Sequence, residues 1–253
     1  TRYWRDWSSD VCSSDLNALK LPRDVVQGDV RWEDESLIFS GQQAQANIPI
    51  AFPEQYELLI AVARIKGNES LNLGFQFGGT TTSVVIEGWG QQVSAISLVD
   101  GKLGLNNETK SAFPVFKDTE PKKIRIVVRR ESILVDVDGG VFIDYRDSPS
   151  RLSFDERYFR RPGMNQLMIA SRNSTFRVSG CVLKPFGDQP VYYTETHHED
   201  ASTTDMSAII SQAEPSANRS SERNVPTLND SDSPDRKSTR LNSSHANISY
   251  AVF

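Results

Sequence analysis

Four side chains in two consecutive apolar segments have the chemistry best suited to binding a ligand. In the first segment, LNLGFQFGG, the apolar residues alternate and turn Asn72 and Gln76 to the opposite face. In the second, SVVIEGWG, the same alternation places Glu87 and Trp89 together, away from the core. Sugars stack on aromatic rings and hydrogen-bond to carboxylates and amides, so we expect a glycan as the partner if the segments are neighbouring strands. The alternative is that Trp89 covers the core and Glu87 pairs with an arginine.

Carboxylates are the remaining candidates for catalysis, because residues 17–187 contain no histidine. A Ser-His-Asp or Cys-His triad and a histidine-ligated catalytic zinc are therefore excluded there. Glycosidase chemistry needs two carboxyl groups about 5 to 9.5 Å apart across a cleft, and the best pair combines Glu87 with Asp100 or Glu108. The adjacent histidines that follow this region lack the spacing of a zinc site. We expect neither a metal ion nor a cofactor.

β-Strands must position these side chains, because apolar residues recur with a period of two through most of residues 17–187. The Asp138-Gly139 pair suits a tight hairpin turn. With about twelve to fourteen short strands and no long helix, the pattern predicts an all-β fold, an antiparallel β-sandwich of two sheets. A helical turn is expected only over residues 153–161. The alternating positions are Tyr56, Leu58, Ile60 and Val62; Leu71, Leu73, Phe75 and Phe77; Val84 and Ile86; Ile124, Ile126 and Val128; Ile133, Val135 and Val137; Val141, Ile143 and Tyr145; and Phe176, Val178 and Val182.

The two ends of the chain are related at the nucleotide level in a way that no protein property explains. Residues 1–16 can be written in codons whose reverse complement translates as DRKSTRLNSSHANIS, and this string is residues 235–249. The nucleotide string is similar to a widely used short-read sequencing adapter. We therefore interpret residues 1–16 and 235–253 as translated adapter that is not native, rather than as a structured arm and a cationic tail.

Charge and glycine content divide the remaining chain near Gly187. Residues 17–187 hold all fifteen glycines and 21 lysines and arginines against 20 acids, whereas residues 188–234 hold 2 against 9. The second region has too little apolar surface to offset its ordering entropy, so we expect a disordered acidic linker. The near-neutral charge of the first argues against nucleic acid as a partner, and no run is apolar enough for insertion into a membrane. Cys181 is expected to be a small core residue.

Five segments follow one another in a distinctive order along residues 29–186. They are YELLIAVARIKGNESLNLGFQFGG, VVIEGWG, ISLVDG, KIRIVVRRESILVDVDGGVFIDY and QLMIASRNSTFRVSGCVLKPF. This order resembles the concanavalin A-like jelly roll, which includes LamG-like domains. More narrowly, it is similar to the 3-keto-disaccharide hydrolase-type branch, also grouped as domain of unknown function 1080. The resemblance implies a carbohydrate-associated jelly-roll sandwich over residues 17–187.

Three functions are compatible with the predicted fold and the candidate site residues. The leading interpretation is a non-catalytic carbohydrate-binding or interaction module of a larger bacterial multidomain protein, outside the cytoplasm or at the cell surface, whose flanking domains are missing from this sequence. The alternative that the resemblance implies is a glycan-processing hydrolase or lyase of the 3-keto-disaccharide hydrolase type that uses carboxylates. A second alternative is an architectural spacer domain.

Overall fold

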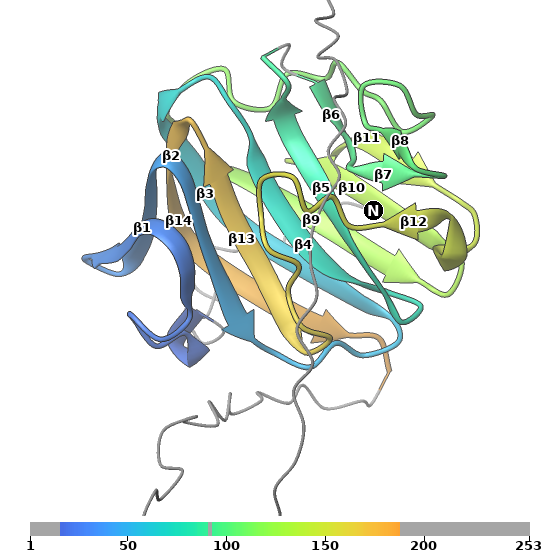
Figure 1. Ribbon diagram of the computed structural model, residues 1–253, viewed down its shortest axis with the longest axis horizontal. Coiled ribbons are helices and arrows are strands. Elements are labelled where there is room, and N and C mark those ends of the chain that lie inside the picture. Colours follow the sequence, from blue (N-terminus) through green and yellow to red (C-terminus); the bar gives the residue numbers. More distant parts are fainter. Residues whose placement is uncertain (1–15, 91–92, 188–253) are drawn as a thin grey trace, which may run out of the picture. The chain divides into compact units, whose positions relative to one another are not determined.

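The computed structural model describes residues 16–90 and 93–187, which form fourteen β-strands and two short 3-10 helices (Figure 1). The expected linker and both expected adapter segments lie outside these residues, except for Leu16. The strands are β1 (Val25–Glu33), β2 (Ser36–Pro49), β3 (Tyr56–Gly67), β4 (Leu71–Phe77), β5 (Thr80–Gly88), β6 (Val93–Ile96), β7 (Leu98–Val99), β8 (Lys102–Leu103), β9 (Lys122–Arg129), β10 (Ser132–Val137), β11 (Gly140–Tyr145), β12 (Leu152–Ser153), β13 (Gln166–Arg172) and β14 (Ser174–Pro185). The helices are η1 (Leu16–Ala18) and η2 (Pro149–Arg151).

Eleven strands form one antiparallel sheet in the order β11-β10-β9-β3-β14-β2-β13-β4-β5-β6, with β1 also paired to β2. The sheet folds into two layers where long strands pass from one layer to the other. Arg172 of β13 pairs with Gln43 and Phe176 of β14 pairs with Phe39, so β13 and β14 follow β2 in one continuous register. On their other edges, β13 pairs with β4 in the front layer and β14 pairs with β3 in the back layer (Figure 1). The predicted fold, a two-sheet antiparallel jelly-roll β-sandwich, is confirmed.

The hydrophobic core lies between the two layers. Alternating residues of β4 and β5 face it from the front, and alternating residues of β3, β9 and β10 face it from the back. Of the alternating apolar positions named from the sequence, all are buried except Val141 and Val182. The tight turn between β10 and β11 is also confirmed, with φ of 48° at Asp138 and 85° at Gly139.

The two incorrect core positions follow irregularities in strand pairing. An extra residue in β11 shifts its register against β10, and Val141 is left 51% exposed. In β14 the register against β3 shifts between Val178 and Gly180, after which Cys181 is buried and Val182 is not. Because side chains alternate with a period of two, one inserted residue reverses the face of every residue that follows. Cys181 is a core residue, as expected.

The segment between β12 and β13 crosses the outer face of the front layer (Figure 1). It contains no helix, so the helical turn expected over residues 153–161 is wrong; the nearest helix is η2, which ends at Arg151. Its Phe154 and Phe159 form a second apolar cluster with Met168 and Ala170 of β13. Burial of these two rings, rather than helical hydrogen bonding, holds the segment on the sheet. Neither helix of the described residues is long and apolar enough to span a membrane.

Candidate functional site

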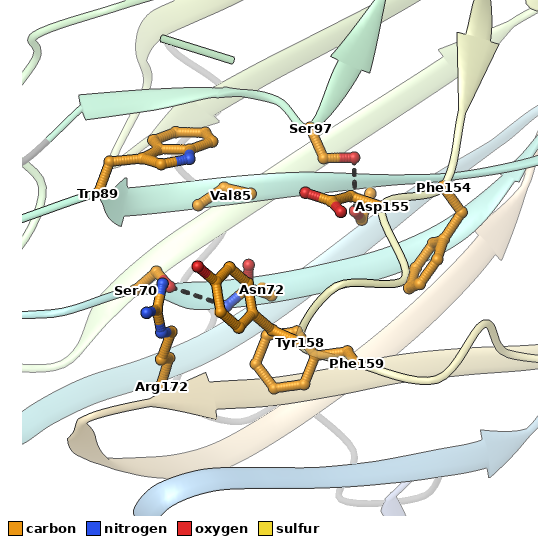
Figure 2. A pocket seen from close by; sticks show the side chains of 11 residues that line it. Ser70, Asn72, Val85, Trp89, Ser97, Phe154, Asp155, Tyr158, Phe159 and Arg172 are labelled. Carbon is orange, nitrogen blue, oxygen red and sulfur yellow. Dashed lines mark hydrogen bonds between the residues drawn. The ribbon is translucent and has the colours of Figure 1, made fainter. Parts of the chain in front are cut away.

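A hollow lies on the outer face of the front layer, between β4, β5 and the crossing segment (Figure 2). Its volume is about 30 Å³. Small polar groups and the apolar Val85 line its floor, aromatic rings line its walls, and one arginine and one aspartate complete the lining. The lining residues are Ser70, Asn72, Ser83, Val85, Trp89, Ser97, Phe154, Asp155, Tyr158, Phe159 and Arg172.

The floor of the hollow follows from alternation along two paired strands. Leu71 and Leu73 of β4 face the core, so Asn72 between them faces outward and pairs with Val85 of β5. The Asn72 side-chain amide donates to the Ser70 hydroxyl over 2.9 Å. Ser83 and Ser97 add a second pair of hydroxyls 2.9 Å apart. The floor is therefore lined by small hydrogen-bonding groups.

Trp89 forms one wall of the hollow, and its indole packs over Gly104, which has no side chain. A Cβ placed on Gly104 would lie 2.3 Å from Cη2 of the indole and 2.7 Å from the methyl group of Ala95. The ring therefore rests on Gly104, next to Ala95, and it remains partly exposed. This position requires glycine, because any β-carbon at residue 104 displaces the indole.

Glu87 does not share the surface of Trp89, which corrects the expectation from strict alternation. Between Val85 and Gly88, β5 contains one residue more than β6, and Glu87 adopts a left-handed φ of 51° in this bulge. A Cβ on Gly88 would lie 2.6 Å from the Val85 side chain, so Gly88 and Val85 both face outward. The inserted residue turns the carboxylate inward, where it is 1% exposed.

The buried Glu87 carboxylate pairs with an arginine, which was the alternative that the sequence left open. Its Oε2 lies 2.7 Å from Nη1 of Arg64 in β3. Its Oε1 accepts the backbone N–H groups of Val115 and Phe116 over 2.5 and 2.9 Å. Arg64 in turn donates to the Phe116 carbonyl over 2.8 Å. This cluster ties the loop before β9 to both layers and is closed to ligands.

Gln76 also lies away from the hollow. Its side chain is 6% exposed and donates to the Thr81 hydroxyl over 2.8 Å, across the hairpin between β4 and β5. Of the four residues expected to form the binding surface, the structure therefore brings Asn72 and Trp89 together and separates Gln76 and Glu87 from them.

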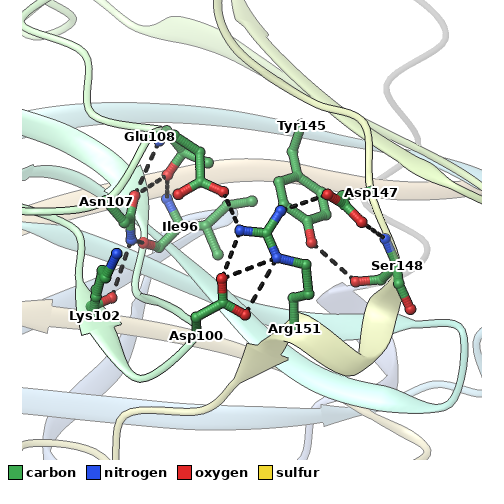
Figure 3. A network of polar contacts seen from close by, with 10 residues as sticks. Ile96, Asp100, Lys102, Asn107, Glu108, Tyr145, Asp147, Ser148 and Arg151 are labelled. Atoms are coloured by element: carbon green, nitrogen blue, oxygen red, sulfur yellow. Dashed lines mark hydrogen bonds and ion pairs between the residues drawn. The ribbon is translucent and has the colours of Figure 1, made fainter.

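Asp100 and Glu108 lie together around Arg151 (Figure 3), whereas Glu87 pairs with Arg64. One guanidinium nitrogen of Arg151 is 2.6 Å from the Asp100 carboxylate and 2.8 Å from that of Glu108. The second terminal nitrogen, Nη1, is 2.5 Å from the Asp147 carboxylate. All three acids are about half exposed, and none lines the hollow.

Hydrogen bonding in this network favours the ionised form of its two aspartates. The side-chain hydrogen bonds from Arg151 hold the pKa of Asp100 below its usual range. The backbone N–H of Ser148, followed by Arg151, lowers the pKa of Asp147. An acid held as a carboxylate in this way is poorly suited to donate a proton to a leaving group. Within the described ranges, no group of three His, Cys, Asp or Glu side chains could hold a metal ion.

Five lining residues were missed from the sequence because they come from the crossing segment and the end of β13: Phe154, Asp155, Tyr158, Phe159 and Arg172. The guanidinium carbon of Arg172 lies 3.7 Å from the centre of the Tyr158 ring. Asp155 forms an ion pair with Arg157, with a nitrogen to oxygen distance of 2.6 Å. The sequence feature that could have indicated this part of the site is the run FDERYFRR, residues 154–161, in which aromatic and charged residues are interleaved without strand alternation.

No protein-family model and no curated protein matches this chain. Among solved structures, a carbohydrate-binding module, CBM66 from Bacillus subtilis, is 10% identical with a TM-score of 0.42 and covers 63% of this chain and 93% of its own. A Bacillus subtilis protein of unknown function with a galectin-like fold is 9% identical with a TM-score of 0.46, covering 62% and 86%. The apo form of the Crh5 transglycosylase is 11% identical with a TM-score of 0.49, covering 71% and 85%. Because these TM-scores are below 0.5, the fold assignment rests on strand order and pairing alone, and the narrower resemblance to 3-keto-disaccharide hydrolase-type domains stays a prediction.

Proposed function

We propose that the hollow binds a saccharide and that residues 17–187 act as a non-catalytic carbohydrate-binding module of a larger bacterial protein. The observation that carries this proposal is the placement of Trp89, whose indole rests on Gly104 at the edge of a floor made of small hydroxyl and amide groups. An indole held against a hydrogen-bonding floor suits a sugar, which has one apolar ring face and a rim of hydroxyl groups.

The opposite wall supports the same ligand class. Tyr158 is 36% exposed and lines the hollow across from the indole, so the site has two rings that a sugar can contact. One aromatic contact contributes on the order of 1 kcal/mol beyond its buried area, and a neutral hydrogen bond contributes about 0.5 to 1.5 kcal/mol. A few such contacts give a free energy of binding of about 4 to 8 kcal/mol, which corresponds to millimolar to micromolar affinity.

The positions of the carboxylates favour binding over glycoside cleavage. Hydrolysis by two carboxyl groups requires both to face one cleft, about 5 to 9.5 Å apart. Glu87 is enclosed with Arg64, and Asp100 and Glu108 bind Arg151. Asp155 is the single acid among the described residues that line the hollow, and it is paired with Arg157.

The proposal is tested by glycan-array screening of the full chain, followed by calorimetric titration of the strongest hit. Trp89→Ala is expected to remove binding while the melting temperature and the β-sheet circular dichroism stay near those of the wild type. Trp32→Ala is the matched control, because Trp32 is 37% exposed on β1 and does not line the hollow. Its binding should equal that of the wild type.

Three results would contradict the proposal. Absence of any glycan binding would favour the architectural spacer. Unfolding of the Trp89→Ala variant would make the indole a core residue. Turnover of a glycoside by the wild type would favour the enzyme alternative.

A further inference from the structure

We propose that the saccharide is acidic and that Arg172 binds its carboxylate, so that the module recognises uronic acid residues. This inference rests on the proposed function, since it assigns the chemical class of the sugar that the same hollow takes. Four features of the hollow carry it: the placement of Arg172, its lack of an acidic partner, the size of the cavity and the donors beside it.

Arg172 is held in place at the edge of the hollow. It is the last residue of β13, and its backbone is fixed by pairing with Gln43 of β2. Its guanidinium carbon lies 3.7 Å from the centre of the Tyr158 ring. Figure 2 shows Arg172 beside Ser70 and Tyr158. Stacking on an aromatic ring leaves the edge of a planar guanidinium free to donate two parallel hydrogen bonds.

Arg172 differs from the nearby arginines in its ion pairs. In the crossing segment Arg157 pairs with Asp155 over 2.6 Å, and Arg161 pairs with Glu156 over 3.1 Å. No carboxylate in the described part of the chain forms an ion pair with Arg172. Asp155 lines the same hollow, but Arg157 already neutralises its charge. A half-buried cation without a counter-ion favours an anionic ligand.

The volume of the cavity agrees with a small anionic group rather than a whole sugar ring. A water molecule requires about 10 to 15 Å³ of such space, so a cavity of about 30 Å³ accommodates about two water-sized groups. The two oxygen atoms of a carboxylate match this size. The ring that carries the carboxylate would then lie over the mouth, against Trp89 and Tyr158.

The floor supplies further donors for such a group. The Ser70 hydroxyl accepts a hydrogen bond from the Asn72 amide, which leaves its own proton to donate. A carboxylate accepts hydrogen bonds only, so a guanidinium and a hydroxyl on one side of the cavity are complementary to it. A neutral hydroxymethyl group at the same position would leave the guanidinium without an anionic partner.

The test compares acidic oligosaccharides with their carboxyl-reduced counterparts. The probes are tetrasaccharides of glucuronic, galacturonic and mannuronic acid, the neutral sugars obtained by reducing each carboxylate to a hydroxymethyl group, and a 6-sulfated galactose oligosaccharide. Calorimetric titration of the wild-type chain should show binding of at least one uronate, at least tenfold tighter than its reduced counterpart. That factor corresponds to about 1.4 kcal/mol, and it should shrink at high salt concentration.

Two variants assign the effect to Arg172. Arg172→Gln should lower the affinity for the uronate at least tenfold and leave the affinity for the reduced sugar unchanged. Arg177→Gln removes the same charge from an exposed position of β14, where Arg177 pairs with Glu33, and should bind the uronate like the wild type. The comparison of uronate with reduced sugar uses wild type alone, so it stays decisive even if Arg172→Gln does not fold.

The outcomes separate this inference from the proposed function. Equal binding of a uronate and its reduced counterpart would overturn the inference and leave saccharide binding intact. Binding of the sulfated sugar without any uronate would overturn the carboxylate assignment. Failure of every saccharide in both the array and the titrations would overturn the proposed function, and this inference with it.

Discussion

Replacing Glu87 by Gln should destabilise the domain strongly without affecting its ligand site. The substitution keeps the shape of the side chain and keeps Oε1 as an acceptor for the N–H groups of Val115 and Phe116. It replaces the oxygen that lies 2.7 Å from Arg64 by an NH2 group, so that donor faces donor and the cation loses its partner. Arg64 is only 9% exposed, so water cannot compensate for the lost charge.

Breaking a buried ion pair by removing one partner typically costs about 3 to 5 kcal/mol. For a domain of this size, that loss corresponds to a fall in melting temperature of about 6 to 20 °C. Urea unfolding followed by circular dichroism measures the free energy. Saccharide binding by the folded fraction, well below the transition, should remain at the wild-type level because Glu87 does not line the hollow.

Two further variants separate charge from packing in this cluster. Glu33→Gln is the control, because Glu33 pairs with Arg177 across 3.3 Å at a half-exposed position, and its change should cost less than about 1 kcal/mol. The double variant Arg64→Met with Glu87→Gln removes both charges and should be more stable than Glu87→Gln alone. If Glu87→Gln keeps the wild-type stability and instead abolishes a glycosidase activity of the wild type, the structural role assigned to Glu87 is wrong.

Three other predictions address the acidic network, the tryptophan support and the chain ends. Folding lowers the pKa values of Asp100 and Asp147, which bind Arg151, so these aspartates stabilise the folded state at pH values above their unfolded pKa of about 3.9. This contribution is lost as the pH falls below about 3.9. Between about pH 5 and about pH 2, the melting temperature of Arg151→Gln should therefore fall less than that of the wild type. Gly104→Ala introduces a methyl group that would lie 2.3 Å from the Trp89 ring and 2.7 Å from the Ala95 methyl group, so titration should show weakened saccharide binding, the fluorescence emission should shift, and the free energy of unfolding should fall by about 1 to 3 kcal/mol. Removal of residues 1–15 and 235–253, the expected adapter without Leu16, should leave the melting temperature unchanged, and a stability loss in the trimmed chain would contradict the adapter interpretation. Leu16→Ala should instead cost about 2 to 5 kcal/mol, because this last residue of the expected adapter is 0% exposed and packs in the core.

The fold could be predicted from the sequence because one face of nearly every strand is buried. A strand that turns one face to the core must place apolar residues at alternate positions, and the alternate apolar positions of β3, β4 and β9 named from the sequence are all buried. The two core positions that were predicted incorrectly, Val141 and Val182, each lie next to a register shift. A bulge inserts one residue without any strong sequence signature, so a pattern of period two cannot reveal it.

The ligand site was harder to predict from the sequence than the fold, because its walls come from distant parts of the chain. Asn72 lies on a regular strand and was placed correctly on the outer face. Tyr158 and Arg172 meet only because the crossing segment folds back over β13, held by Phe154 and Phe159 in a cluster of their own. No local period predicts where such a segment lies, since its position depends on the apolar surface that the outer face offers.

The bulge in β5 explains why one short segment, SVVIEGWG, serves two purposes. Without the extra residue, strict alternation would put Glu87 and Trp89 on the same outer face, and the carboxylate would lie among the ligand contacts. With it, Ile86 and Glu87 both face inward and Gly88 faces outward beside Val85. The carboxylate then joins the two layers through Arg64, while the indole two residues later reaches the hollow over Gly104. One inserted residue thus assigns neighbouring side chains to stability and to binding, which is why their substitutions should affect different measurements.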